Sequence, residues 1–341
     1  MTDDLKGHLQ GFFTDRLVTV IGLGHSAAYG LPTMPDLADH LRAEMPARLG
    51  GGQVAEWKTV EDALTRGEHL EPALDAIDHD SPVVETIVAV VAECIAAAEE
   101  MAIDQICRDP SAYPLARLLE KVGFSGQARV ITTNYDRLIE LAAEIAGFLL
   151  DTGFVGSHYG IYDVDLSHKV LRSLLVRRPK KFKVSYRAHV VLAKPHGSLD
   201  WFASGETPIR SPYPLDLPRL MITPGESKYR RGYEQPFDHQ VKIAYEAIDD
   251  ADAVLAIGFG FNDPHLQTHL LPRIREGLPT LILTRDLTPA ATELLPECPH
   301  LTALERIAPD GGTRVHRGSD QHELPDSEIW QLGDFIGEVL E

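Results

Sequence analysis

The sequence predicts an α/β protein built on a doubly wound parallel sheet, with a helical insertion and a second, smaller insertion. Five short runs are almost wholly apolar, as strands are when both faces of a parallel sheet are covered. Helical patterns lie between several of these runs, and that alternation is typical of α/β folds. A long stretch with helical spacing separates the first two runs, so we expect it to form an insertion outside the sheet.

The first apolar run, at residues 17–21, leads into Gly22-Leu23-Gly24 and then into a helical pattern from about Met34. A strand, a tight glycine turn and a helix begin a Rossmann-like, nucleotide-binding βα unit. Helical spacing continues over residues 57–119, with breaks expected at Gly67, 79–82 and 109–110. The remaining expected elements are strands at 128–133, 190–193, 253–258 and 280–284 and a helix at 137–146.

We expect a single domain over residues 1–341. Its expected parts are a Rossmann-like core (15–50, 121–150, 188–202 and 250–300), a helical insertion (52–120), secondary insertions (151–187 and 203–249) and a C-terminal segment ending in a helix (301–341).

Composition excludes several classes of protein. The net charge of −19 argues against a general polyanion-binding surface. Only Cys94, Cys107 and Cys298 occur, without a CxxC pair, which excludes a disulfide framework and fits a reducing cytoplasm. Four glutamates interrupt the most apolar stretch, 83–103, and the N-terminus lacks a signal-peptide pattern. We therefore expect a cytoplasmic protein with no membrane contact.

Polar and glycine residues follow the predicted strands where each strand ends. In open parallel sheets, ligands bind outside the carboxyl ends of the strands. The segments concerned are 22–26, 133–136, 196–197, 258–263 and 284–286. Their coincidence predicts one shared site.

Each of these segments can also be explained without a ligand. A tight βα turn can require glycine without any ligand, and Asn or Asp beside a helix start can be a cap. His196 is one of 15 histidines. Because it follows a strand directly and precedes Gly197, it is the best candidate for a general base.

Five motifs occur in a fixed order, and together they resemble the bacterial sirtuin-like domain of anti-phage defence proteins. The resemblance spans about residues 15–290. The motifs are Gly22-Leu23-Gly24-His25-Ser26, Gly30-Leu31-Pro32, Thr133-Asn134-Tyr135-Asp136, Lys194-Pro195-His196-Gly197-Ser198-Leu199-Asp200-Trp201 and Gly258-Phe259-Gly260-Phe261-Asn262-Asp263-Pro264-His265.

The chain departs from the deacylase branch of that family in three ways. Pro32 is not followed by a Pro-Asp-Phe-Arg segment, Thr133-Asn134 stands where deacylases have Gln-Asn, and three cysteines cannot build a four-cysteine zinc module. The resemblance therefore implies a zinc-free NAD+ hydrolase with no metal site. It would release nicotinamide and ADP-ribose as a defence effector.

The resemblance also implies roles for single residues. Asn134 would position the water or the ribose, His196 would accept a proton, and Asp136 would bind the carboxamide or stabilise the developing cation. Gly22, Gly24 and Ser26 would cradle the diphosphate, and Gly258, Gly260 and Thr284 would line the adenosine half. The full expected NAD+-binding set is Gly22, Gly24, His25, Ser26, Thr133, Gly197, Gly258, Gly260, Asn262, Asp263 and Thr284.

Residues 166–194 contain nine Lys or Arg and no acidic residue. This basic run could be a solvated face, an interface with the chain's own acidic insertion, or a docking site for a partner or nucleic acid. Proteins of the resembled type are encoded beside a hexameric HerA-type ATPase, which implies a homo-oligomer with that partner and only indirect nucleic-acid contact. Two other functions stay open: an NAD-dependent protein deacylase and a non-catalytic subunit that senses NAD or ADP-ribose.

Overall fold

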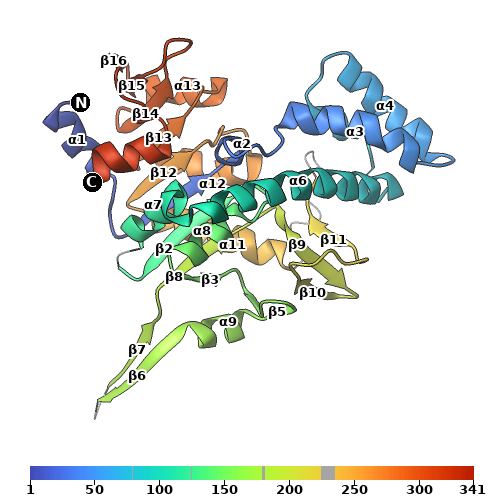
Figure 1. Cartoon of the computed structure of the whole chain (residues 1–341), viewed down its shortest axis with the longest axis horizontal. Coiled ribbons are helices and arrows are strands. Elements are labelled where there is room, and N and C mark those ends of the chain that lie inside the picture. Colours follow the sequence, from blue (N-terminus) through green and yellow to red (C-terminus); the bar gives the residue numbers. More distant parts are fainter. Residues whose placement is uncertain (79, 124, 179–180, 224–234) are drawn as a thin grey trace.

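A nine-stranded sheet forms the centre of the computed structural model, which describes residues 1–78, 80–123, 125–178, 181–223 and 235–341 (Figure 1). The strand order is β16-β15-β14-β13-β12-β1-β2-β8-β3. The seven strands from β14 to β3 pair in parallel, and β15 and β16 are antiparallel. The bounds are β1 Leu17–Ile21, β2 Gln127–Thr132, β3 Leu149–Asp151, β8 His189–Ala193, β12 Ala253–Ile257, β13 Thr280–Thr284, β14 Leu301–Arg306, β15 Thr313–Arg317 and β16 Asp320–Leu324.

The five predicted strands are confirmed as β1, β2, β8, β12 and β13, and the doubly wound architecture is confirmed with them. Alternate residues of a strand point to opposite faces. In β1, Leu17 and Ile21 join one core cluster, while Val18 and Val20 join another. The first cluster lies under α6 (Pro82–Arg108), α7 (Pro114–Val122) and α8 (Leu138–Ile145). The second lies under α11 (Phe237–Asp249), α12 (Pro264–Arg275) and α13 (Pro289–Glu297).

The strand order reverses beside β1. From β1 the sheet grows through β2 and β8 on one side, and the chain later returns to place β12, β13 and β14 on the other. In an open α/β sheet this reversal opens a crevice at the carboxyl ends of the two strands. Gly22 follows β1 there, and Gly258 follows β12.

The segment expected as a helical insertion forms α4 (Gln53–Thr65), α5 (Leu70–Leu74), α6 and α7. α6 begins at Pro82, behind Ser81, whose hydroxyl accepts from the Val83 amide. That arrangement explains the predicted break, because serine caps free N–H groups and proline suits the first turn. α3 (Met34–Arg48) packs against α6, and together with α4 it forms an arm of the molecule (Figure 1).

The second insertion is an antiparallel sheet, in the order β11-β9-β10-β5-β4. Its strands are β4 Phe154–Val155, β5 Gly160–Tyr162, β9 Gly197–Ser204, β10 Thr207–Arg210 and β11 Arg219–Met221. After α9 (Val164–Leu171), β6 (Arg172–Arg178) and β7 (Lys181–Tyr186) form a separate two-stranded ribbon that projects from the body (Figure 1).

Three strands after residue 300 extend the central sheet, followed by α14 (Leu332–Phe335) and a π-helical turn (Ile336–Leu340). The chain thus ends in helical turns, and the central sheet continues past residue 300. The division of the chain into a core and insertions stays a prediction. Within the described ranges, no helix is both long and apolar enough to cross a membrane.

Candidate active site

A cavity of about 610 Å³ lies outside the carboxyl ends of β1, β2, β8 and β12. This volume is in the range of small-molecule and cofactor sites. Residues that follow these four strands line it, whereas none of the fifth predicted segment, 284–286, does. The predicted site residues that line it are Gly22, Thr133, Asn134, Asp136, His196, Gly258, Gly260, Asn262 and Asp263.

The loops after β1 and β12 pack against each other through their glycines. A Cβ on Gly22 would lie 2.5 Å from the Gly258 carbonyl oxygen, and one on Gly258 would lie 2.4 Å from the His25 nitrogen. Gly258 also has a φ of +56°, which favours glycine. The Gly22 and Gly24 amides donate to the carbonyls of Ile257 and Gly258, at 3.0 and 2.9 Å. These two N–H groups therefore join the loops and are not aimed into the cavity.

Asn134 is held by both hydrogens of its amide. Its Nδ2 donates to the Gly22 carbonyl at 3.0 Å and to the Ser26 hydroxyl at 2.8 Å. Ser26 in turn donates to Oδ2 of Asp136 at 2.7 Å. Because both amide hydrogens are used, the group that Asn134 can offer a ligand is the acceptor Oδ1.

His196 and Asp263 face each other across the cavity, with Nε2 2.9 Å from Oδ2. The two atoms are within ion-pair distance, and they form an ion pair only when the imidazole is protonated; their angle falls outside hydrogen-bond geometry. Both side chains are only 7% exposed. Oδ1 of Asp263 accepts from the Leu266 amide at 3.0 Å and so caps α12. One carboxylate therefore starts a helix and lies beside the candidate base.

The wall of the cavity carries acidic side chains. Glu71, Asp136 and Asp263 line it, and its described lining contains no Lys or Arg. Such a wall suits a ligand group that carries or develops positive charge.

The start of α3 with the loop before it, together with α5 and α6 of the helical insertion, supplies a wall that the sequence did not predict. The residues of this wall are largely apolar. They are Leu31, Pro32, Met34, Leu37, His69, Leu70, Pro72 and Ile95, with Glu71 as the acidic member. Helical spacing alone gave no sign of which face would turn toward the strand ends.

Five predicted binding residues do not line the cavity: Gly24, His25, Ser26, Gly197 and Thr284. His25 is buried beside Tyr113, and burial lowers its pKa to about 4. Gly197, at a φ of +83°, begins β9, and a Cβ on it would lie 2.0 Å from the Leu220 carbonyl. Thr284 donates to the carbonyl of Asp286.

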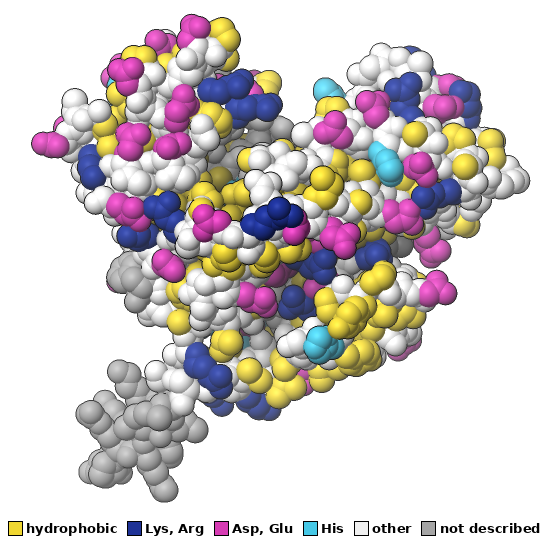
Figure 2. Space-filling model, in the orientation of Figure 1, with side chains coloured by type: hydrophobic (Ala, Val, Ile, Leu, Met, Phe, Trp, Pro, Cys, Tyr) yellow, Lys and Arg dark blue, Asp and Glu magenta, His cyan; other side chains and the backbone are white. Residues whose placement is uncertain are grey.

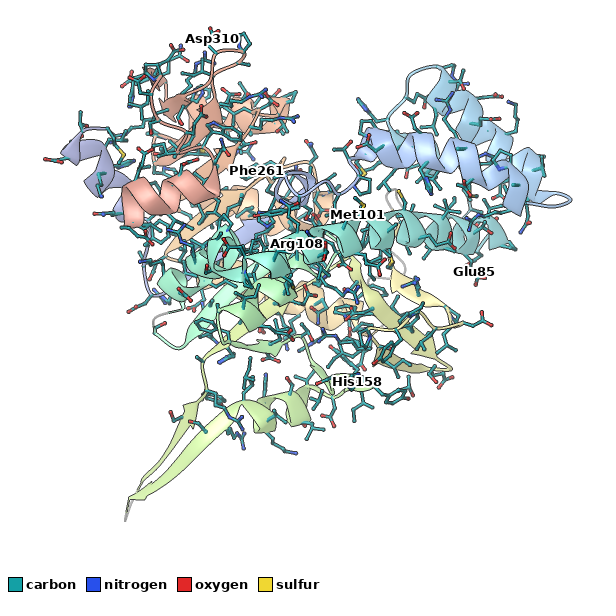
Figure 3. All side chains as sticks on the ribbon, in the orientation of Figure 1. Glu85, Met101, Arg108, His158, Phe261 and Asp310 are labelled. Atoms are coloured by element: carbon teal, nitrogen blue, oxygen red, sulfur yellow. The ribbon has the colours of Figure 1, made fainter. Side chains whose placement is uncertain are left out.

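Phe261 adopts a φ of 54° in the loop after β12. A bulky residue in the left-handed region is uncommon, and such strain concentrates at functional sites. The ring is fully buried against Phe259, and the Phe261 carbonyl accepts from Gln267. Figure 3 shows Phe261 in the middle of the molecule, beside the loop that carries α2 (Leu23–Ala27).

No group of three or more His, Cys, Asp or Glu in the described part of the chain is arranged to hold a metal ion. The three cysteines are free. A zinc-free site stays a prediction.

Comparison with known proteins found a match to one family model and similarity to solved structures, two of which are described below. Residues 128–286 match a family model described as the SIR2-like domain. No curated protein matches the chain. A structure described as "The Structural basis of Sirtuin Substrate Affinity" aligns with a TM-score of 0.42 and 16% identity, covering 85% of this chain and 89% of that one. Another, described as "Structural Basis for the Mechanism and Regulation of Sir2 Enzymes", aligns with a TM-score of 0.37 at the same identity and coverage.

The matched range contains β2, β8, β12 and β13, and with them Asn134, His196 and Asp263. This part of the chain is therefore similar to the SIR2-like domain, and it includes the strand ends that bring these three residues to the cavity.

Proposed function

We propose that this chain hydrolyses NAD+ at the bond between nicotinamide and ribose, giving nicotinamide and ADP-ribose. The observation that carries the proposal is the meeting of Asn134 and His196 in one cavity with three carboxylates, where the described lining residues include no Lys or Arg. The SIR2-like match supports it, because that domain implies NAD-related activity.

The charge of the cavity fits this reaction. The nicotinamide ring of NAD+ is cationic, and positive charge moves to the ribose as the bond to C1′ breaks, as in glycoside hydrolysis. Fixed carboxylates near that charge stabilise the transition state most where water is excluded. Asp136 and Asp263 are both buried. Nicotinamide leaves as a neutral molecule, so the site needs no acid for the leaving group.

The two polar side chains have complementary roles in this proposal. Oδ1 of Asn134 accepts a hydrogen from the attacking water or from a ribose hydroxyl and so fixes its position at C1′. His196 then accepts the proton that the water or the hydroxyl loses. The Asp263 carboxylate orients the imidazole and stabilises the charge that it acquires.

The apolar wall has a place in the same scheme. Met34, Leu37, Leu70 and Ile95 offer a surface for the flat face of nicotinamide and keep water away from it. The diphosphate must find donors other than the Gly22 and Gly24 amides. Cofactor-binding roles for Gly24, His25, Ser26, Gly197 and Thr284 remain predictions.

The proposal is tested by incubating the purified chain with NAD+ and following nicotinamide release. Asn134→Ala and His196→Ala should each lower the rate by about 10²–10⁴-fold, the usual contribution of one positioned proton-transfer group. His322→Ala is the matched control, because His322 is exposed on β16 at the edge of the central sheet and does not line the cavity. Wild-type rates in both site variants would refute the assignment.

One observation also supports a second function, that of an NAD-dependent deacylase. The apolar wall from α3, α5 and α6 could hold an acyl chain as well as a nicotinamide ring. An acyl-lysine peptide separates the two: a hydrolase releases nicotinamide at the same rate without it, whereas a deacylase requires it. Binding of NAD+ without any release of nicotinamide would instead indicate a sensing subunit.

We further propose that the protein acts as an anti-phage effector in a homo-oligomer, with a HerA-type ATPase as partner. Three exposed cations stand at the base of the β6–β7 ribbon: Lys169, Arg172 and Arg187. Figure 2 shows Lys and Arg side chains gathered where the ribbon leaves the body. The basic residues Lys228, Arg230 and Arg231 and the ribbon's turn lie outside the described residues.

An apolar patch adds to this surface. Tyr159, Ile161 and Tyr213 are 59%, 40% and 56% exposed on or beside β5 and β10. Figure 2 shows hydrophobic side chains around a histidine in this region, where Figure 3 labels His158. Exposed apolar patches of this kind are typical of association surfaces.

A further inference from the structure

Lys194 differs from the rest of the basic run because it is fully buried. Its side chain is 0% exposed at the end of β8, two residues before His196. A buried lysine is rare unless its charge is paired and its hydrogens are bonded. The proposed reaction assigns it no role.

The ammonium group of Lys194 holds the loop that carries the site. Its Nζ donates to the Asp136 carbonyl at 2.5 Å and lies 3.4 Å from the Tyr135 carbonyl. It also contacts the Ser198 hydroxyl at 3.0 Å, and Ser198 donates to the Tyr135 carbonyl at 3.3 Å. Two consecutive peptide carbonyls directly after Asn134 are therefore fixed by one cation and its neighbour.

The same loop is held from its other end by α6. The carboxylate of Glu99, which is 0% exposed, accepts from the backbone N–H of Arg137 and from its guanidinium. A buried cation thus binds the carbonyls of the loop, and a buried anion binds its last N–H. Charge-assisted bonds of this kind are about twice as strong as neutral ones.

The counter-ion of Lys194 is Glu140 in α8, with Oε1 3.0 Å from Nζ. Burial raises the pKa of Glu140, whereas the lysine lowers it. Buried ion pairs contribute little net stability compared with apolar residues of similar size. Stability alone is therefore a weak reason for this pair, and the position of the loop is a stronger one.

We propose that Lys194 is a positioning residue, which fixes the Asn134–Asp136 backbone so that the Asn134 and Asp136 side chains meet the reacting ribose. The inference rests on the proposed NAD+ hydrolysis for its effect on rate. The clamp itself is a statement about the loop and can be tested without activity.

The test uses the double variant Lys194→Met/Glu140→Gln, which removes the clamp and its counter-ion together and leaves no unpaired buried charge. Arg314→Met/Glu305→Gln is the control, because it removes a partly buried ion pair between β14 and β15, 3.7 Å from Nη1 to Oε2, in strands that do not adjoin the Asn134 loop. Ser198→Ala is a milder third variant for use if the double variant does not fold. Nicotinamide release, melting temperature and deuterium uptake of residues 133–138 are measured for each protein.

We expect the clamp variant to lose about 10²-fold in kcat, the effect of a misplacement near 1 Å, with KM changed much less. Deuterium uptake at 133–138 should rise in this variant and not in the control. Ser198→Ala should show both effects in the same direction but smaller, because it removes the Ser198 contacts and leaves the ammonium group on the Asp136 carbonyl. Unchanged kcat, or a fall in kcat without faster exchange at 133–138, would overturn the proposal.

The failure of the proposed function would look different. If the wild-type chain releases no nicotinamide, NAD+ hydrolysis is refuted and the exchange measurement alone decides on the clamp. Faster exchange at 133–138 then supports it, and unchanged exchange overturns it.

Discussion

His196 and Asp263 lie on opposite sides of the strand-order reversal, yet Nε2 of the imidazole is 2.9 Å from Oδ2 of the carboxylate. His196 follows β8, and Asp263 caps α12 through its other oxygen. The helix start on one side of the crevice therefore orients the candidate base on the other.

The substitution Asp263→Asn separates the two roles of this residue, which are to cap α12 and to orient His196. Asparagine caps a helix about as well as aspartate, so the free energy of unfolding should change by less than about 1 kcal/mol. The charge beside His196 is lost, so nicotinamide release should fall by about 10²-fold or more. Urea unfolding and initial rates, measured on the same preparation, check both halves. Full activity in the variant would show that His196 works without this carboxylate.

Ser26 links the two other catalytic candidates. Its hydroxyl accepts from Asn134 and donates to Asp136, and the residue is 1% exposed. Ser26→Ala should cost about 1–3 kcal/mol in the free energy of unfolding, because it leaves buried polar groups without a partner. The rate should fall as well, since Asn134 loses one of its two restraints. Ser211→Ala, at a buried serine of the second sheet, controls for the loss of a buried hydroxyl.

The strand ends could be predicted from the sequence because their signal is local. Each apolar run stops at a glycine or a polar residue, and parallel strands bring such ends to one edge of the sheet. Asn134, His196 and Asp263 were found in this way. The sequence pattern could not predict which glycines line the cavity and which only pack against another loop. Gly22 lines the cavity and also packs on Gly258, whereas Gly24 only packs.

Gly22→Ala should be strongly destabilising for this reason. The added Cβ would meet backbone atoms of the β12 loop at 2.5 and 2.6 Å, and backbone cannot move aside as a flexible side chain can. We expect a loss of roughly 3 kcal/mol or more in the free energy of unfolding, as for other overpacked core sites. Gly7→Ala in α1 (Asp3–Gln10) is the matched control. No atom lies within 4 Å of its added Cβ, and alanine favours helix by about 0.5–1 kcal/mol. Equal melting temperatures for the two variants would contradict this packing.

His25 should make the stability of the protein depend on pH. Burial lowers its folded-state pKa from 6.5 to about 4. Between these values the unfolded chain binds a proton that the folded chain does not, so stability falls as the pH drops through this window. The full effect is about 3 kcal/mol, from 1.36 kcal/mol per pKa unit. Urea unfolding at pH 7 and pH 4.5 should show a smaller difference between the two conditions in His25→Leu than in the wild-type chain. An identical difference in both proteins would mean that His25 does not titrate in this way.

The wall from the insertion was missed for a physical reason. Helical spacing over 57–119 predicts helices, but which face of α5 turns inward depends on packing between α3, α4 and α6. Leu70 and Pro72 carry no local sign of a ligand. The role of Lys194 was missed because the sequence placed it in a basic run, which predicts an exposed lysine. Only the tertiary structure shows that it is buried under the Asn134 loop.

The last prediction concerns the basic ribbon and its partner. Residues 53–85 carry nine Asp or Glu against two Lys or Arg. The α4 arm and the β6–β7 ribbon stand at opposite ends of the molecule (Figure 1), so the two cannot neutralise each other within one copy. Contact between the ribbon of one copy and the acidic arm of the next would be heterologous and would build a ring or a filament.

Light scattering should therefore report an assembly that dissociates as salt rises from about 0.05 to 0.5 M, because screening shortens the reach of these charges. The triple variant Lys169→Glu/Arg172→Glu/Arg187→Glu should stay monomeric at low salt and keep its melting temperature, since all three side chains are exposed. A monomeric wild-type chain that instead binds duplex nucleic acid through these cations would assign the ribbon to a different partner.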